Sequence, residues 1–190
     1  MKASFPPLLP RKPVPELRVP VVGGRSYDIR KETPATFSLI VFYRGLHCPI
    51  CKTQLKDLET KLGEFERRGV SVVAISTDNE ERALQTSLDW QLPQLRIGYD
   101  LSLQVAREWG LYISSGRGKT STGVEEPERF SEPAIYLVRP DGTLYFGSIQ
   151  TMPFARPHFA DILGAIDYVV KTDYPARGEV DVTFESAAAN

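Results

Sequence analysis

The chain has 190 residues, a net charge of −1 and an apolar fraction of 42%. This length is most simply one domain with a substantial core, and a nearly neutral chain has no general attraction to nucleic acid or to anionic membranes. Since no apolar run in the sequence is long enough to span a bilayer, we expect neither nucleic acid nor membrane as a partner.

The first twenty residues are rich in proline and lack the continuous apolar stretch of a signal peptide. Proline fixes φ and removes a backbone donor, so residues 1–20 are predicted to form an extended arm. We therefore expect a cytoplasmic protein. That compartment is reducing, which disfavours a static disulfide between the two cysteines of the chain.

A buried strand and a helix are predicted around these cysteines. Residues 36–44 (TFSLIVFYR) contain a nearly continuous apolar run, typical of a strand covered on both faces. From Cys48 to Arg68 the period becomes helical, and Gly69 is expected to end the helix. The apolar stripe of this helix comprises Cys51, Leu55, Leu58, Leu62 and Phe65.

The remaining pattern alternates strands and helices. We expect strands at 70–76 and 95–100, a helix capped by Thr77 or Asp78 that runs to Trp90, a short helix at 102–110, a polar surface insertion at 114–129, a β-hairpin around the turn at 140–142, and a helix at 157–170. This order predicts a single α/β domain over residues 21–172, with a mixed central sheet flanked by helices and a loose tail at 173–190.

The cysteine pair, Cys48 and Cys51, has three interpretations. A structural zinc site needs four ligands, and only His47 and His158 could complete one. Two inert, buried cysteines are a second interpretation, and Cys51 on the apolar stripe fits it. A reactive dithiol is the third. Cys-x-x-Cys at a strand–helix junction is a known redox signature, and we favour this interpretation.

The position of Cys48 supports reactivity. It stands at the start of the helix, before a proline, where unpaired backbone N–H groups stabilise a thiolate. Arg44 and His47 are close in sequence, and basic neighbours lower a thiol pKa further. His47 has the alternative interpretation of an ordinary loop residue on the surface. The glycine pair at 23–24 is a turn without a phosphate-binding motif, and we predict no cofactor.

The segment VFYRGLHCPICKTQL resembles the Phe-Tyr-Arg-Gly-x-x-Cys-Pro-x-Cys segment of the alkyl hydroperoxide reductase and thiol-specific antioxidant branch of the thioredoxin-like superfamily. VVAISTD, YDLSLQVAREWGL and SEPAIYLVRPDGTLYF are similar to later segments of that branch. The resemblance covers about residues 15–170. It implies a thioredoxin-like fold and a peroxiredoxin-like activity.

The resemblance also implies roles for residues. Pro133 would be the family's cis-proline, facing the dithiol, and Arg44 or Arg129 would replace an arginine that peroxiredoxins place near Pro133. In the peroxiredoxin pattern Pro-x-x-x-Thr-x-x-Cys, Arg44 stands at the proline, Cys48 at the threonine and Cys51 at the attacking cysteine. The thioredoxin pattern instead makes Cys48 the attacking thiol and Cys51 the resolving one, and this is the order that we favour.

The expected function is therefore thiol-dependent reduction of peroxide or of a disulfide, with Arg44, Cys48, Cys51 and Pro133 as site residues. The partners implied are the oxidised substrate and an external thiol reductant of thioredoxin or glutathione type, and a homodimer is compatible with the sequence. The alternatives are a general protein-disulfide reductase and a non-catalytic binding module on the same scaffold.

Overall fold

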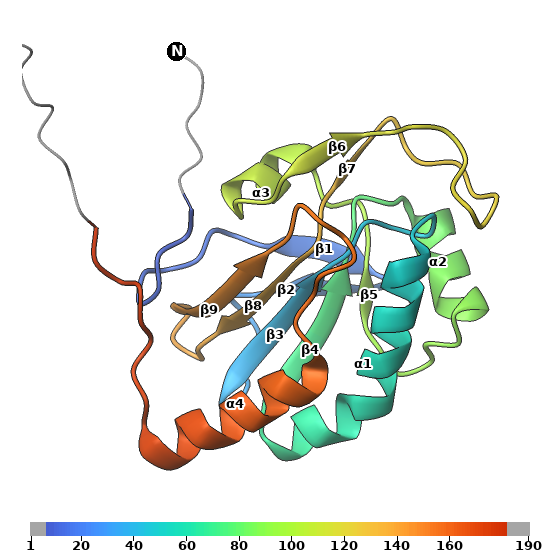
Figure 1. The fold of residues 1–190 in the computed structure, drawn as a ribbon. Coiled ribbons are helices and arrows are strands. Elements are labelled where there is room, and N and C mark those ends of the chain that lie inside the picture. The colour runs from blue at the N-terminus through green and yellow to red at the C-terminus, as the bar shows by residue number, and fades with distance from the viewer. Residues whose placement is uncertain (1–6, 182–190) are drawn as a thin grey trace, which may run out of the picture.

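The computed structural model describes residues 7–181. The described residues form a seven-stranded mixed sheet in the order β2-β1-β5-β4-β3-β8-β9 and a separate two-stranded sheet of β6 and β7 (Figure 1). The strands are β1 (Arg18–Val21), β2 (Arg25–Asp28), β3 (Phe37–Phe42), β4 (Val70–Ile75), β5 (Ile97–Gly98), β6 (Ile113–Ser115), β7 (Arg129–Ser131), β8 (Ala134–Val138) and β9 (Leu144–Ile149).

Four helices are described: α1 (Pro49–Arg67), α2 (Glu80–Asp89), α3 (Leu103–Glu108) and α4 (Phe159–Thr172). β3 pairs in parallel with β4 and antiparallel with β8, which confirms the predicted mixed sheet. The predicted helix end at Gly69 is also confirmed, because this glycine has a φ of 70° directly after the C-cap of α1.

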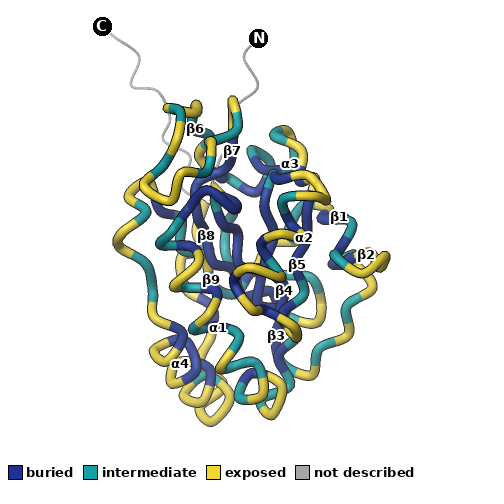
Figure 2. The backbone as a smooth tube through the Cα atoms, turned by 90° about the vertical axis from the view of Figure 1, so that its right-hand side faces the viewer, coloured by how far each residue is buried: buried dark blue, intermediate teal, exposed yellow. Residues whose placement is uncertain are grey.

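Side chains of alternate residues in the central strands pack into two hydrophobic cores on opposite faces of the sheet. On one face, Leu39 and Val41 of β3 pack with the apolar sides of α1 and α4. On the other, Ile40 and Phe42 pack with Trp109 at the end of α3. Figure 2 shows the central strands as almost wholly buried, which is why β3 reads as a continuous apolar run.

Two segments are more structured than the sequence indicates. The insertion at 114–129 is flanked by β6 and β7, which pair from Ile113–Ser131 to Ser115–Arg129, so its two ends form a hairpin and not a free loop. The proposed arm at 1–20 is held against the domain over its described residues, because Arg11 N and Val14 N donate to Leu144 O and Gly142 O and because β1 starts at Arg18 in the main sheet.

The proposed tail is also anchored at its start. Ala176 is buried, and its carbonyl accepts a hydrogen bond of 2.9 Å from Arg11 Nε. The rest of the tail, from residue 182, lies outside the described residues. Within residues 7–181, no helix combines the length and the apolar character that a membrane crossing requires.

Candidate active site

Cys48 is the N-cap residue of α1. Its backbone is extended, and its Sγ accepts a hydrogen bond of 3.2 Å from the backbone N–H of Cys51. Pro49 follows at the first helical position, where its missing N–H costs no hydrogen bond. The thiol thus takes the role that a Ser or Asp side chain usually has at an N-cap, where a negative charge is favoured by the helix dipole.

Cys51 lies one turn further along, on the apolar stripe of α1, and has no exposed surface. Its Sγ accepts a hydrogen bond of 3.4 Å from the backbone N–H of Arg44. No disulfide bond joins the two cysteines in this structure. The expectation that Cys51 points into the core is confirmed, but Cys48 is hardly more accessible, with 1% of its surface exposed.

Arg156 is the site residue that the sequence did not predict. It lies between β9 and α4, and its Nη2 is 3.4 Å from Cys51 Sγ and 3.7 Å from Cys48 Sγ. The guanidinium is held by Pro153 O at 2.7 Å from its Nε and by Gln54 Oε1 at 2.5 Å from its Nη1. This geometry places one fixed positive charge against both sulfurs.

These contacts separate the pKa values of the two thiols. The Cys51 thiol donates a hydrogen bond to Cys48, and together with the charges of Arg156 and Arg44 this lowers the pKa of Cys48 to about 6, against the opposing effect of burial. Burial raises the pKa of Cys51, and the neighbouring Cys48 thiolate raises it further. At neutral pH the negative charge of the pair therefore resides on Cys48.

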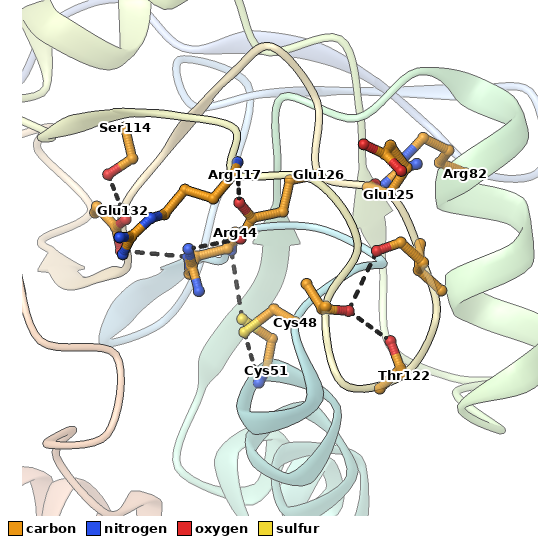
Figure 3. Close-up of polar contacts among 12 residues, drawn as sticks. Arg44, Cys48, Cys51, Arg82, Ser114, Arg117, Thr122, Glu125, Glu126 and Glu132 are labelled. Atoms are coloured by element: carbon orange, nitrogen blue, oxygen red, sulfur yellow. Dashed lines mark hydrogen bonds and ion pairs between the residues drawn. The ribbon is translucent and has the colours of Figure 1, made fainter.

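Arg44 connects the loop before α1 to the segment that follows β6. Its Nη2 lies 3.2 Å from Glu126 Oε1 and its Nε 3.5 Å from Glu132 Oε2, while its guanidinium stacks on Phe130 at 4.7 Å from the ring centre. Figure 3 shows this side chain directed to the two glutamates while its backbone faces the thiols. Arg44 thus contacts Cys51 through its N–H group and influences Cys48 through its charge.

Of the two interpretations of His47, the surface position is wrong. The imidazole is fully buried against Phe130, with ring centres 4.6 Å apart. Burial, together with the charges of Arg44 and Arg82, lowers the pKa of His47 to about 3. The ring is therefore neutral at pH 7 and adds no positive charge to the Cys48 environment.

Asp78 is not a helix cap, contrary to the sequence interpretation. The side chain that caps α2 is Asn79, which accepts from Arg82 N. The buried Asp78 carboxylate instead accepts from the backbone N–H of Leu46 at 2.7 Å and pairs with Arg82 Nε at 2.9 Å. Gly45 permits this approach, because a Cβ at this position would lie 2.6 Å from Asp78 Oδ2. Asp78 thereby fixes the loop that carries Cys48.

The prediction of a cis bond before Pro133 is wrong, because this peptide bond is trans. The backbone on both sides of this bond is held by hydrogen bonds, from Glu132 N to Tyr112 O (2.8 Å) and from Gln150 N to Pro133 O (2.9 Å). Pro133 lies directly before β8, whose first residue pairs with Phe42 at the end of β3. It therefore stands at the end of the sheet from which the Cys48 loop emerges. Arg129, the other proposed arginine, is on β7 and pairs with Glu128 at 3.8 Å.

A pocket of about 180 Å³ lies beside Cys48. Its lining comes from the Cys48 loop, from the first turn of α1, from the end of α2 and from the insertion: Leu46, Cys48, Pro49, Lys52, Gln85, Asp89, Trp90, Thr122 and Val124. Cys51 is not among these residues. Cys48 is therefore the thiol that borders a cavity large enough to admit a small molecule.

Comparison with known proteins identifies the family of the chain. The AhpC/TSA family model matches residues 10–146. The rice (Oryza sativa subsp. indica) protein 1-Cys peroxiredoxin B is 26% identical over 160 residues, which cover 81% of this chain and 69% of the rice protein. The thiol-disulfide oxidoreductase ResA of Halalkalibacterium halodurans is 25% identical over 96 residues, which cover 50% of this chain and 48% of ResA.

Solved structures of peroxiredoxins share this fold. The crystal structure of peroxiredoxin 6 from Arenicola marina superimposes with a TM-score of 0.71 at 20% identity, covering 87% of this chain and 75% of that chain. Because the family model spans well over half of the sequence, the protein belongs to the AhpC/TSA family and is a peroxiredoxin-like, thiol-dependent oxidoreductase with a thioredoxin-like fold.

Proposed function

We propose that the protein reduces peroxides with Cys48 as the attacking thiolate and Cys51 as the resolving thiol. The observation that carries this proposal is the position of Arg156, whose Nη2 lies within 3.4 Å of Cys51 Sγ and 3.7 Å of Cys48 Sγ. Negative charge develops on sulfur and on peroxide oxygen during the reaction, and a fixed cation at this point stabilises it. Arg44 supports the site through the hydrogen bond from its backbone N–H to Cys51 Sγ. We also propose that Pro133 forms one wall of the site.

The first step is attack of the Cys48 thiolate on one peroxide oxygen. The O–O bond breaks, Cys48 becomes a sulfenic acid, and the leaving alkoxide or hydroxide takes a proton. The Cys51 thiol already donates its proton towards Cys48, so it is well placed to protonate the leaving oxygen. Cys51 is then left as a thiolate beside Arg156.

The second step is attack of the Cys51 thiolate on the Cys48 sulfur. The S–O bond breaks, hydroxide leaves, and an intramolecular disulfide forms. Cysteines three apart at the start of a helix can reach bonding distance without rebuilding the domain. Two equivalents of an external thiol then restore the dithiol. Dependence on such a thiol supports a reducing compartment, and we propose the cytoplasm. We also propose that the protein forms a homodimer. Light scattering, which measures the molar mass in solution, tests this.

Stopped-flow mixing of the reduced protein with hydrogen peroxide tests this function. We expect two thiols to be lost per chain, and mass spectrometry to show a two-hydrogen loss that links Cys48 to Cys51. Oxidation no faster than that of free cysteine, or a dominant intermolecular dimer, would contradict the proposal. Labelling at pH 7 tests the order, because Cys51 as the first residue alkylated would make Cys51 the attacking thiol.

Reduction of protein disulfides is the second candidate. The observation in its favour is the asymmetry of the pair, with an acidic first thiol at the helix start and a buried second thiol of raised pKa. The same asymmetry serves attack on a disulfide sulfur. Mixing the reduced protein with a model disulfide under the same conditions gives the comparison, and the faster substrate identifies the activity.

A further inference from the structure

The pocket beside Cys48 has a buried floor and an exposed, charged rim. Leu46, Cys48 and Trp90 form the buried floor. The rim includes Lys52 from α1 and Asp89 from α2, both exposed, and Gln85, whose Nε2 donates to Asp89 Oδ2 at 3.1 Å. A cation and an anion thus lie around one apolar floor that ends at the reactive sulfur.

The insertion closes the remaining side of the pocket with Thr122 and Val124. It is anchored by two arginines from different elements. Arg82 Nη2 donates to Glu125 O at 3.1 Å, and Arg44 Nη2 contacts Glu126 at 3.2 Å. Figure 3 shows the part of the insertion that carries Thr122 running past the start of α1. The pocket beside Cys48 is therefore walled by the Cys48 loop, α1, α2 and the insertion.

We propose that this pocket binds a low-molecular-weight thiol carrying both an ammonium and a carboxylate group, such as cysteine or a short cysteine peptide, and that this thiol reduces the Cys48–Cys51 disulfide. Lys52 would pair with its carboxylate and Asp89 with its ammonium. The inference deepens the proposed function, since it names the reductant of that cycle. A protein thiol on a broad surface does not fit a pocket of about 180 Å³.

The chemistry balances with two molecules of thiol. The first thiolate attacks Cys48 Sγ, the Cys48–Cys51 bond breaks, and Cys51 leaves as a thiolate that Arg156 stabilises at 3.4 Å. A second thiolate attacks the sulfur of the bound thiol, which forms a small-molecule disulfide and releases the Cys48 thiolate. Two electrons pass from the two thiols to the protein.

The test uses full-length protein whose Cys48–Cys51 disulfide is formed with diamide, so that it does not depend on peroxide being the oxidant. Reduction is followed by stopped-flow fluorescence and by thiol titration, with L-cysteine, cysteine ethyl ester, 3-mercaptopropionate and 2-mercaptoethanol. Rates are corrected for the thiolate fraction and intrinsic reactivity of each thiol. We expect L-cysteine to exceed 2-mercaptoethanol by about tenfold, because each exposed ion pair contributes about threefold.

Variants assign this preference to the rim. Lys52→Ala should lower the ratio of the L-cysteine rate to the 2-mercaptoethanol rate about threefold, and Asp89→Asn should do the same. Lys56→Ala removes a lysine of the same helix outside the pocket lining and should leave the ratio unchanged. Equal corrected rates for all four thiols, ratios unaffected by the rim variants, or faster reduction by thioredoxin than by an equal concentration of L-cysteine would overturn the inference. Failure of diamide to form the Cys48–Cys51 disulfide would overturn the inference as well.

Discussion

The substitution Arg156→Gln isolates the contribution of one charge to the site. Glutamine keeps a polar side chain of similar length but removes the cation that lies 3.7 Å from Cys48 Sγ. The other contacts that lower the pKa of Cys48 remain, namely the hydrogen bonds from Cys51 and the charge of Arg44. We therefore expect an intermediate pKa, above that of the wild-type thiol and below that of free cysteine.

The size of the effect follows from the distance. Coulomb's law gives about 4 to 5 kcal/mol for unit charges 3.7 Å apart at an effective dielectric constant of about 20, and about 1 kcal/mol in bulk water. Arg156 is half-buried, so about 2 kcal/mol is a reasonable value, and this moves the pKa of Cys48 from about 6 to about 7.5. The thiolate fraction at pH 7 then falls from about nine tenths to about a quarter.

Alkylation by iodoacetamide across pH 5–9, with peptide mass spectrometry to locate the label, measures this pKa. Since a depressed thiol pKa means that the thiolate persists down to that pH, wild-type labelling of Cys48 should be lost only as the pH falls through about 6. In Arg156→Gln the same loss should occur near pH 7.5. Arg129→Gln is the matched control, because Arg129 pairs with Glu128 and not with the thiols. Coincident profiles for wild type and Arg156→Gln would refute the electrostatic argument.

Three other perturbations have definite expected outcomes. Cys48→Ser should abolish peroxide turnover, whereas Cys51→Ser should allow one oxidation and trap a sulfenic acid on Cys48, which dimedone labelling detects; the reverse pattern would assign the attack to Cys51. Gly45→Ala should lower the free energy of unfolding by about 1 to 3 kcal/mol in a urea titration, because φ is 127° at Gly45 and the new Cβ would collide with Asp78. Gly123→Ala is the control and should cost less, because there is open space around Gly123. Pro133→Ala should leave the circular dichroism spectrum unchanged, since the native bond is trans, and should reduce kcat/KM if Pro133 walls the site; an unchanged kcat/KM would remove it from the site.

Local patterns were sufficient to predict the main elements of the fold and the cysteine pair. The strand before the cysteines, the stripe on α1 and the glycine that ends α1 each depend on residues adjacent in sequence, and the structure confirms them. The same holds for the position of Cys48 at the helix N-terminus. These features depend on backbone geometry and on burial, and both leave a periodic signal.

Long-range contacts explain what the sequence did not predict. Arg156 stands 105 positions after Cys51, in a connection whose residues show no periodicity that would place it near the thiols. Asp78 and Asn79 both fit a helix cap by type, and only the contact of Asp78 with Leu46 N reveals that the aspartate serves the cysteine loop. His47 gives no sequence sign of burial, because Phe130, the residue it packs against, comes from the far end of the insertion hairpin.

The asymmetry of the two thiols has a simple origin in one helical turn. An N-cap side chain folds back over the unpaired N–H groups of the first turn, whereas a residue three positions later lies on the face that α1 buries against the sheet. A Cys-x-x-Cys at this place therefore makes the first thiol the more acidic of the two, and the charges of Arg156 and Arg44 help to lower its pKa to about 6. In the proposed cycle, negative charge moves from Cys48 to Cys51 and back. Because Arg156 lies within 3.7 Å of both sulfurs, it can stabilise the charge at either end of that movement without changing its own position.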